Sequence, residues 1–244
     1  MQDHRLLRGI LLLLPCLAIS AWAQTDTLTL ENTGANYVMG GVFTSPYGIS
    51  INGGTPVSLI CDDFTTDISV GESWTATVTT FAAIEAGTNP PGTPKFTPVD
   101  IQNYATVAVL AAELQSLPNL ATEAAGEISY ALWDVFDPTL LNSTSNPYGT
   151  ITSTELAAAQ SYLSGAEALV TGATTGGTVN LSSIIVDGNA IEGMTIYTPN
   201  PLSSAQEFVS VTVAEPPSPA LFGLDLLGLA GLMLFARRRL GRCI

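Results

Sequence analysis

The stretch VDIQNYATVAVLAAELQSL, residues 99 to 117, decides the fold class of this chain of 244 residues. Its apolar side chains recur every three or four positions, the spacing that places them along one side of a helix. The members of this stripe are Ile101, Tyr104, Val107, Ala108 and Ala111. A helix is therefore expected near the middle of the chain.

Strand patterns lie on both sides of this helix. Alternating or β-branched runs that end in turn residues are typical of strands. Those before the helix are TLTL at 27–30, YVMGGVF at 37–43, GISI and VSLI around the turn Asn52-Gly53-Gly54, and WTATVTTF at 74–81. Those after it are TVNLSSIIV at 178–186, MTIYT at 194–198 and EFVSVTV at 207–213.

Two further helices are expected in the central region. One covers 121–136 and ends before Pro138, because a residue that precedes proline is steered away from helical geometry. The other begins with a capping box, in which Thr152 and Glu155 satisfy each other's free backbone donors, and continues to about Val170.

The order of strands, helices and strands favours one α+β domain over residues 24–213. We expect the N- and C-terminal strands to share a β-sheet or barrel, with the helices forming a lobe inserted between them. Residues 86–98 are dense in proline and glycine, so they are expected to form a surface loop.

Residues 1–23 have the three parts of a secretory signal peptide: two arginines, an apolar run, and a small-x-small cleavage site at 21–23. Cleavage there makes Gln24 the first residue of an exported chain. Cys16 raises the alternative of lipoprotein processing, but Pro15 stands where that signal has a small residue.

The C-terminal region has the features of a membrane tether. Residues 220–236 form an apolar run of the minimum length for a transmembrane helix, preceded by a proline-rich linker at 214–219. A basic tail, 237–244, follows and is expected to stay in the cytoplasm. Its membrane stop is the cluster Arg237, Arg238 and Arg239. The alternative, a buried core helix, has no place for three arginines at a chain end.

This tail, AEPPSPALFGLDLLGLAGLMLFARRR, resembles the PEP-CTERM sorting tail, with Glu215 and Pro216 in the sorting motif. Ala214 stands where the first proline is usual, and Asp225 interrupts the apolar run. The resemblance implies an exosortase-type processing enzyme as partner in a Gram-negative bacterium. It also implies an inner-membrane intermediate, followed by a cell-surface or secreted form.

The charge of the central region excludes some functions. Between residues 24 and 218 the only basic side chain is Lys95, and nineteen acids give a net charge of −18. Such a surface repels nucleic acid and has no arginine to bind phosphate.

The central region also lacks the residues of common catalytic sites. The single histidine, His4, lies in the signal segment, and Cys61 is the only cysteine between residues 24 and 218. Serine triads, Cys-His pairs and the usual zinc sites therefore cannot be assembled. We expect no enzyme, no cofactor and no metal site.

Three segments of the domain resemble the thioester domains of bacterial surface adhesins. They are ICDDF at 60–64, EISYALWDVFDP at 127–138 and AQEFVSV at 205–211. The family has an early strand with cysteine, a central Gln-x-Ala-aliphatic-Trp helix motif and a late glutamine. The matching residues are Cys61, Gln206, and Ala131 and Trp133 as motif support, with Ser129 where the motif has glutamine.

The resemblance implies an internal thioester. A cysteine sulfur that is held against a glutamine carboxamide by adjacent strands can expel ammonia, because proximity makes a poor reaction feasible. A surface amine, a hydroxyl or an exopolysaccharide that enters such a site is acylated by Gln206 while Cys61 leaves. The chain is then an adhesin that attaches covalently.

Several alternatives stay open. Cys61 can be a small buried apolar residue, and Asp62 and Asp63 should raise its pKa. DDFTTD at 62–67 has acids for calcium but lacks an EF-hand's glycine and distal glutamate. Carboxylate pairs, such as Asp134 with Asp137, could serve a glycosidase, although nineteen acids make pairs inevitable and most are expected on the solvated surface.

Trp133 and Phe136 are expected to be core residues and not a binding platform. Without thioester chemistry, the chain is instead a passive structural or carbohydrate-associated protein of a biofilm's extracellular matrix.

Overall fold

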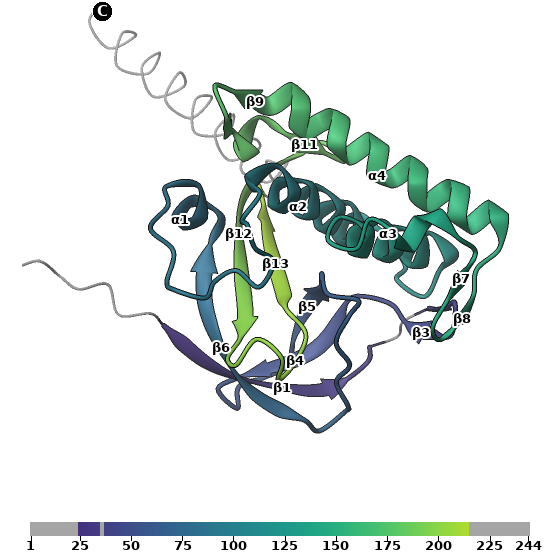
Figure 1. Cartoon of the computed structure of the whole chain (residues 1–244), viewed down its shortest axis with the longest axis horizontal. Coiled ribbons are helices and arrows are strands. Elements are labelled where there is room, and N and C mark those ends of the chain that lie inside the picture. Colours follow the sequence, from purple (N-terminus) through teal and green to yellow (C-terminus); the bar gives the residue numbers. More distant parts are fainter. Residues whose placement is uncertain (1–23, 35–36, 215–244) are drawn as a thin grey trace, which may run out of the picture.

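The computed structural model describes residues 24–34 and 37–214 (Figure 1). The predicted signal peptide, the sorting motif with Glu215 and Pro216, the membrane helix and the arginine cluster lie outside these residues. Among the helices of the described part, none is both apolar and long enough to span a bilayer.

Six antiparallel strands close into a barrel. Their order is β12-β13-β5-β4-β1-β6, and β6 pairs with β12 to complete the circle. Their bounds are β1 (Thr25–Asn32), β4 (Tyr47–Ile51), β5 (Val57–Cys61), β6 (Ser73–Thr80), β12 (Asn189–Pro199) and β13 (Phe208–Val213). A short strand, β11 (Ile185–Val186), extends the sheet beside β12. The N- and C-terminal strands therefore share one sheet, as the sequence predicts.

Alternating burial fixes which face of each strand lines the barrel. In β1, Asp26, Leu28 and Leu30 are buried while the threonines between them are more exposed, the two-residue period of a strand with one covered face. The turn from β4 to β5 uses Asn52 and Gly53, whose φ angles of 53° and 71° lie in the left-handed region. Asparagine and glycine tolerate that region better than other residues do.

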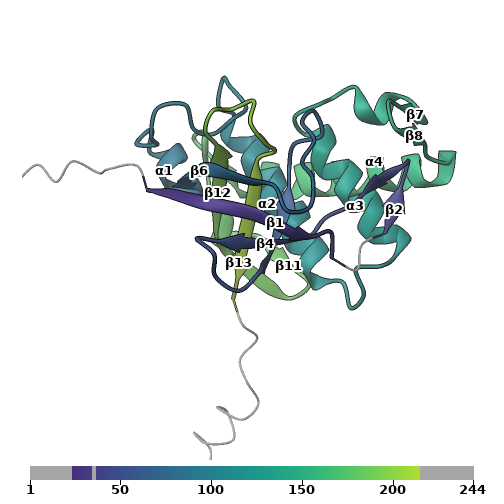
Figure 2. The ribbon, with the colours of Figure 1, turned by 90° about the horizontal axis from the view of Figure 1, so that it is seen from below.

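The helices form a lobe on one side of the barrel (Figure 1, Figure 2). Its members are α2 (Ile101–Ser116), α3 (Glu123–Asp134) and α4 (Ser153–Ala173), while the short α1 (Phe81–Glu85) follows β6 directly. α2 contacts β12 and β13 as well as α3 and α4, so it lies between the barrel and the rest of the lobe. The predicted lobe inserted between the strand regions is confirmed.

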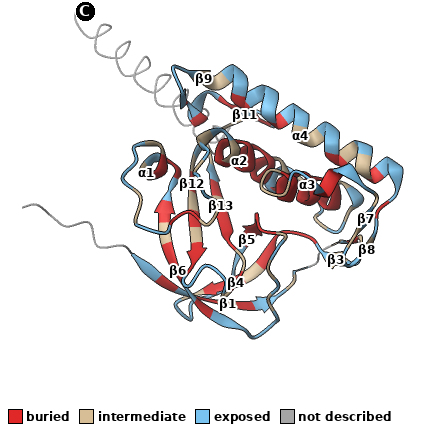
Figure 3. Cartoon of the chain, in the orientation of Figure 1, coloured by how far each residue is buried: buried red, intermediate tan, exposed pale blue. Residues whose placement is uncertain are grey.

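Burial extends around nearly the whole of α2, beyond the single stripe that its sequence predicts. Every residue from 104 to 112 is buried, and Ile101, the first member of the predicted stripe, is only partly buried (Figure 3). The cause is that α2 has the sheet on one side and two helices on the others, so small alanines are buried between the larger side chains.

The predicted helix starts and ends agree with the structure to within a few residues. α4 begins after Thr152, whose side chain accepts a hydrogen bond from Glu155 N at 3.1 Å. The Glu155 carboxylate in turn accepts one from Thr152 N, which completes the predicted capping box.

Two predicted strands are wrong. Residues 37–43 form a tight hairpin, β2 (Val38–Met39) and β3 (Val42–Phe43), because Gly40 and Gly41 adopt positive φ angles and reverse the chain. Residues 178–186 are broken by a 3₁₀ turn, η2 (Leu181–Ser183), between β10 (Thr178–Val179) and β11. The remaining short elements are η1 (Leu140–Asn142), β7 (Ser145–Asn146), β8 (Gly149–Thr150) and β9 (Thr174–Thr175).

Buried apolar side chains form two clusters. One fills the space between the sheet and the three long helices, and it includes most of α2. The other fills the barrel and includes Trp74 and Phe208, with Cys61 among them. Phe208 stacks on Trp74 at a centroid distance of 5.8 Å and meets Tyr47 edge-on at 5.9 Å.

Phe208→Ala should therefore lower the free energy of unfolding by about 3–5 kcal/mol, since it empties the centre of the barrel. Phe43→Ala is the matched control, because Phe43 is 52% exposed and its loss should change stability by less than about 0.5 kcal/mol. Urea unfolding followed by tryptophan fluorescence measures both. Similar losses for the two variants would contradict the barrel core described here.

Candidate functional site

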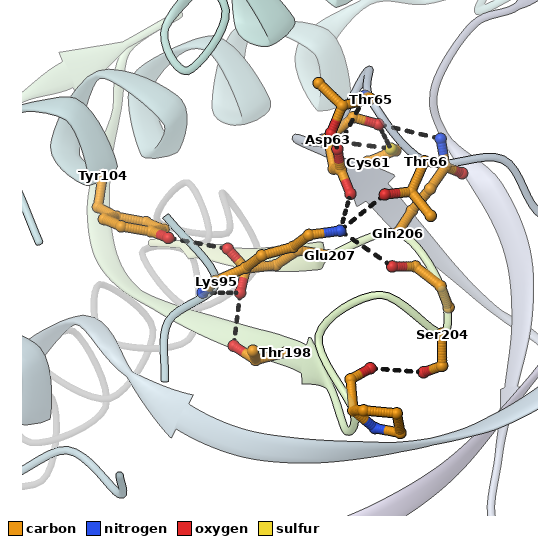
Figure 4. Close-up of polar contacts among 12 residues, drawn as sticks. Cys61, Asp63, Thr65, Thr66, Lys95, Tyr104, Thr198, Ser204, Gln206 and Glu207 are labelled. Atoms are coloured by element: carbon orange, nitrogen blue, oxygen red, sulfur yellow. Dashed lines mark hydrogen bonds and ion pairs between the residues drawn. The ribbon is translucent and has the colours of Figure 1, made fainter. Parts of the chain in front are cut away.

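Cys61 and Gln206, far apart in the sequence, meet at one end of the barrel. Cys61 is the last residue of β5 and lies opposite Phe208, the first residue of β13, so Gln206 stands just before the paired strand. The Cys61 thiol donates to the Asp63 carbonyl oxygen at 3.1 Å, and Gln206 Nε2 donates to the same oxygen at 3.0 Å. The sulfur and the carboxamide therefore converge on one acceptor (Figure 4).

The backbone of Cys61 is held on both sides by side chains from other elements. Its N–H donates to Ser45 Oγ at 3.0 Å, and its carbonyl oxygen accepts from Trp133 Nε1 at 3.0 Å. Ser129 Oγ accepts from Ser45 N at 3.2 Å and donates to the Ala125 carbonyl, so α3 supports Cys61 through two contacts. The indole N–H of Trp133 thus fixes the backbone position of Cys61.

The three residues predicted to support the motif have different places. Trp133 contacts Cys61 directly, and Ser129 reaches it through Ser45. Ala131 is fully buried within the helical lobe cluster and makes no polar contact with Cys61. Trp133 is 2% exposed, so the prediction that it is a core residue is confirmed.

The environment keeps the Cys61 thiol protonated. Burial raises its pKa most strongly, and the charges of Asp63 and Asp62 raise it further. The Asp63 N–H and the Trp133 indole act in the opposite direction but do not reverse the shift. The expected increase in pKa is confirmed, although loss of solvent contributes more to it than the neighbouring carboxylates do.

Lys95 joins the two segments that carry Cys61 and Gln206 (Figure 4). Its Nζ lies 2.5 Å from Asp63 Oδ2, 2.8 Å from Thr66 Oγ1 and 3.2 Å from the Ala205 carbonyl oxygen. The first two contacts are to the segment after β5, and the third is to the residue before Gln206. Lys95 thus connects the ends of β5 and β13 at the site.

Glu207, next to Gln206, is buried and fully hydrogen-bonded. Its carboxylate accepts from Tyr104 OH at 2.8 Å, from the Lys95 backbone N–H at 2.7 Å and from Thr198 Oγ1 at 2.5 Å. Burial raises the pKa of Glu207, while these three donors lower it in part. Glu207 therefore ties α2, the 86–98 loop and β12 to the start of β13.

Asp62 is fully buried, and neither of its carboxylate oxygens has a hydrogen-bond partner. Burial raises its pKa well above the usual value, and the negative charges of Glu207 and Asp63 raise it further. The charge of Lys95 lowers it in part. Burial and the neighbouring negative charges therefore favour the protonated form of Asp62.

A cavity of about 480 Å³ opens beside Gln206. Aromatic side chains line much of it, and the Asp67 carboxylate is held at its wall by two contacts from Tyr148 OH at 3.0 and 3.1 Å. The aromatic members of the lining are Phe43, Tyr47, Phe64, Trp133 and Tyr148. Gln206 lines the cavity and Cys61 does not, so a molecule in the cavity would meet the carboxamide first.

Three contributors to this site were not predicted from the sequence. Ser45 gave no sequence signal, whereas Lys95 was distinctive as the only basic residue of the central region. Glu207 could have been suspected because it follows Gln206 and begins an apolar strand. The expectation that 86–98 is a surface loop is only partly right, since Thr93 and Pro94 are buried where the loop descends to place Lys95.

The structure also bears on the acidic residues that were considered for a calcium site or a glycosidase. Asp62, Asp63 and Glu207 are completely buried, so the expectation that the acids are mostly solvated fails at this site. In residues 24–34 and 37–214 no group of three acids, histidines or cysteines could hold a metal ion. Asp134 and Asp137 accept hydrogen bonds from Leu141 N and from Thr139, so they order the loop that follows α3.

Comparison with known proteins gives two solved structures with weak likeness. One is the N-terminal domain of the Streptococcus pyogenes pilus tip adhesin Cpa, at 10% identity, with a TM-score of 0.44, over 79% of this chain and 95% of that domain. The other is the N-terminal thioester domain of the fibronectin-binding protein SfbI from the same organism, at 10% identity, with a TM-score of 0.42, over 80% and 95%. No family model and no curated protein matches the sequence.

Asp62→Asn should reduce the loss of stability with rising pH. The folded-state pKa of Asp62 is raised above its usual 3.8, so the folded chain keeps a proton that the unfolded chain releases as pH rises past that value. Stability falls through this window by at most about 1.4 kcal/mol per pH unit for one such group. The Asp62→Asn variant has no carboxyl group at this position, so it lacks this pH dependence.

Unfolding at several pH values from 3 upward measures the effect as the difference in slope between variant and wild type. Asp187→Asn, at an exposed turn, is the control and should leave the slope unchanged. Identical slopes for Asp62→Asn and wild type would contradict the raised pKa of Asp62.

Proposed function

We propose that this chain is an exported surface protein whose Cys61 and Gln206 form an internal thioester, through which it bonds covalently to a target surface. The observation that carries this proposal is the convergence of the Cys61 sulfur and the Gln206 carboxamide on the Asp63 carbonyl oxygen. Both groups lie within hydrogen-bond distance of that oxygen, and this placement supplies the proximity that the reaction needs.

Thioester formation replaces the side-chain amide nitrogen of Gln206 with the sulfur of Cys61. The sulfur of Cys61 attacks the side-chain carbonyl carbon of Gln206, the carbon–nitrogen bond breaks, and the thiol proton leaves with the amide nitrogen as ammonia. Trp133 and Ser45 hold the cysteine backbone, so the sulfur stays aimed while the bond forms.

Attachment to the target surface then breaks the thioester. An amine or hydroxyl of the target enters the cavity beside Gln206, attacks the same carbonyl carbon and expels the Cys61 sulfur as a thiol. Complete burial of Cys61 and the aromatic lining of the cavity limit access of water, which protects the bond until a target arrives. One molecule forms one bond, so no catalytic turnover and no cofactor are needed.

Export and sorting complete the proposal. The predicted signal peptide delivers the domain across the inner membrane, and the tail that resembles a PEP-CTERM signal holds it there until an exosortase-type enzyme processes it. The domain then acts at the cell surface or in the secreted matrix of a Gram-negative bacterium, where exopolysaccharide, other hydroxyls and amines are its targets.

A passive matrix protein is the second candidate. The raised pKa and complete burial of Cys61 favour it, because an inert buried thiol has the same properties. In that case the barrel serves as a structural or carbohydrate-associated unit, and the cysteine only packs beside Phe208.

Intact mass separates the two candidates. Thioester formation should lower the mass of the purified protein by about 17 Da, the mass of one ammonia, and methylamine should then add about 31 Da. Cys61→Ala and Gln206→Glu should each abolish both changes, since the first lacks the sulfur and the second lacks the ammonia leaving group.

Thiol labelling provides the cross-check. Wild-type protein with the thioester intact should resist alkylation until methylamine is added, and its labelling should then approach one reagent per chain. Native protein of full mass whose Cys61 is alkylated on denaturation without methylamine would support the passive candidate instead.

The route through the cavity can be tested separately. Ser69 lies on the cavity lining and is exposed, so Ser69→Trp should fill the entrance and slow methylamine adduct formation about tenfold while leaving the initial mass loss intact. Ser164→Trp, on an exposed position of α4, is the matched control. Equal adduct rates for the two variants would place the entry route elsewhere.

A further inference from the structure

Lys95 is the only lysine of the chain, and its amine is placed inside the protein against a carboxylate. Its side chain is 12% exposed and that of Asp63 is completely buried. Nζ lies 2.5 Å from Oδ2, so the two groups are in direct contact. Thr66 and Ala205 accept from the same nitrogen and hold it in place.

A buried ion pair of this kind is a poor source of stability. Removing two charges from water costs several kcal/mol, and the mutual attraction of the pair often does no more than offset that cost. A reaction that consumes both charges and leaves a neutral amide removes the cost altogether. The burial of this pair therefore favours condensation over an ordinary salt bridge.

Asp62 supplies the third component. It is buried next to the pair, its pKa responds to the charges of both Asp63 and Lys95, and its two oxygens have no hydrogen-bond partner. Glu207, by contrast, already accepts three hydrogen bonds and receives the Lys95 backbone N–H, not the amine. Asp62 is thus the carboxylic acid that is free to exchange protons.

We infer that Lys95 and Asp63 condense to an amide bond between Nζ and Cγ, with Asp62 as the proton carrier. This inference goes beyond the proposed thioester and does not depend on it. The bond would cross-link the 86–98 loop to the segment that follows β5, two residues from Cys61.

The reaction balances without an external reagent. The Lys95 ammonium gives one proton to the Asp63 carboxylate, which produces a neutral amine and a neutral acid. Nζ attacks Cγ while Asp62 donates its proton to an Asp63 oxygen, and Asp62 then accepts the second proton of the nitrogen. One Asp63 oxygen departs as water, and Asp62 regains its neutral form.

Trypsin provides a direct test on the full chain. Between Arg8 and Arg237 the sequence contains no lysine or arginine except Lys95, and Phe96 follows it, so a free Lys95 is a single internal cleavage site. The denatured, alkylated protein should give one long peptide that spans residue 95, because an amidated lysine is not recognised. Its mass should be lower by about 18 Da, the mass of one water.

Lys95→Arg is the matched variant, since it keeps the positive charge but offers no primary amine for the bond. It should be cut after residue 95 and should show no loss of water. Asp62→Asn should lower the cross-linked fraction at least several-fold, and an undiminished fraction would overturn the role of Asp62. Complete tryptic cleavage of the wild-type chain at Lys95 would overturn the inference as a whole.

The thioester is measured in the same samples, independently of the Lys95–Asp63 amide bond. Cys61→Ala should remain resistant to trypsin at residue 95 while losing the ammonia mass change and the methylamine adduct. Conversely, wild-type protein that shows the ammonia mass change but is cut completely at Lys95 would contradict the amide bond and leave the thioester standing. Each bond can therefore fail without the other.

Discussion

The pairing of β13 with β5 is the constraint on which the site depends. Only two residue pairs join these strands, yet they close the barrel and bring Gln206 beside Cys61 from the far side of the helical insertion. The Asp63 carbonyl then receives both side chains. The helices lie between these strands in sequence, and α2 packs on β12 and β13, so the lobe contacts the strand that carries Gln206 into this short pairing.

The sequence predicted the architecture better than it predicted the chemistry around the site. Helix periodicity, the capping box at Thr152 and the Asn52-Gly53 turn are local signals, and their elements are present as expected. The prediction of one strand over 178–186 was wrong because β-branched residues at both ends of this segment indicate a strand, whereas a 3₁₀ turn at Leu181–Ser183 separates them. Cys61 and Gln206 were brought together by analogy with a family pattern, and strand pairing now gives that juxtaposition a physical basis within this chain.

The burial of acidic side chains at the site could not be predicted from the sequence. Nothing local distinguishes Asp62 and Asp63 from the other acids, because burial depends on how the 86–98 loop and α2 cover the end of the barrel. The solitary Lys95 was a usable signal. In a region with nineteen acids, a single cation that lies in a proline-rich loop marks the place where negative charge must be neutralised inside the protein.

The position of Gln206 has a mechanical consequence. In a chain that is tethered beyond β13 and bonded to a surface through Gln206, tension runs only along the few residues from 206 to the end of that strand at Val213. The helices and the other five barrel strands lie outside this line of force, as does Cys61 once its sulfur has left. Pulling would therefore load a short covalent segment and would not need to be resisted by the folding stability of the domain.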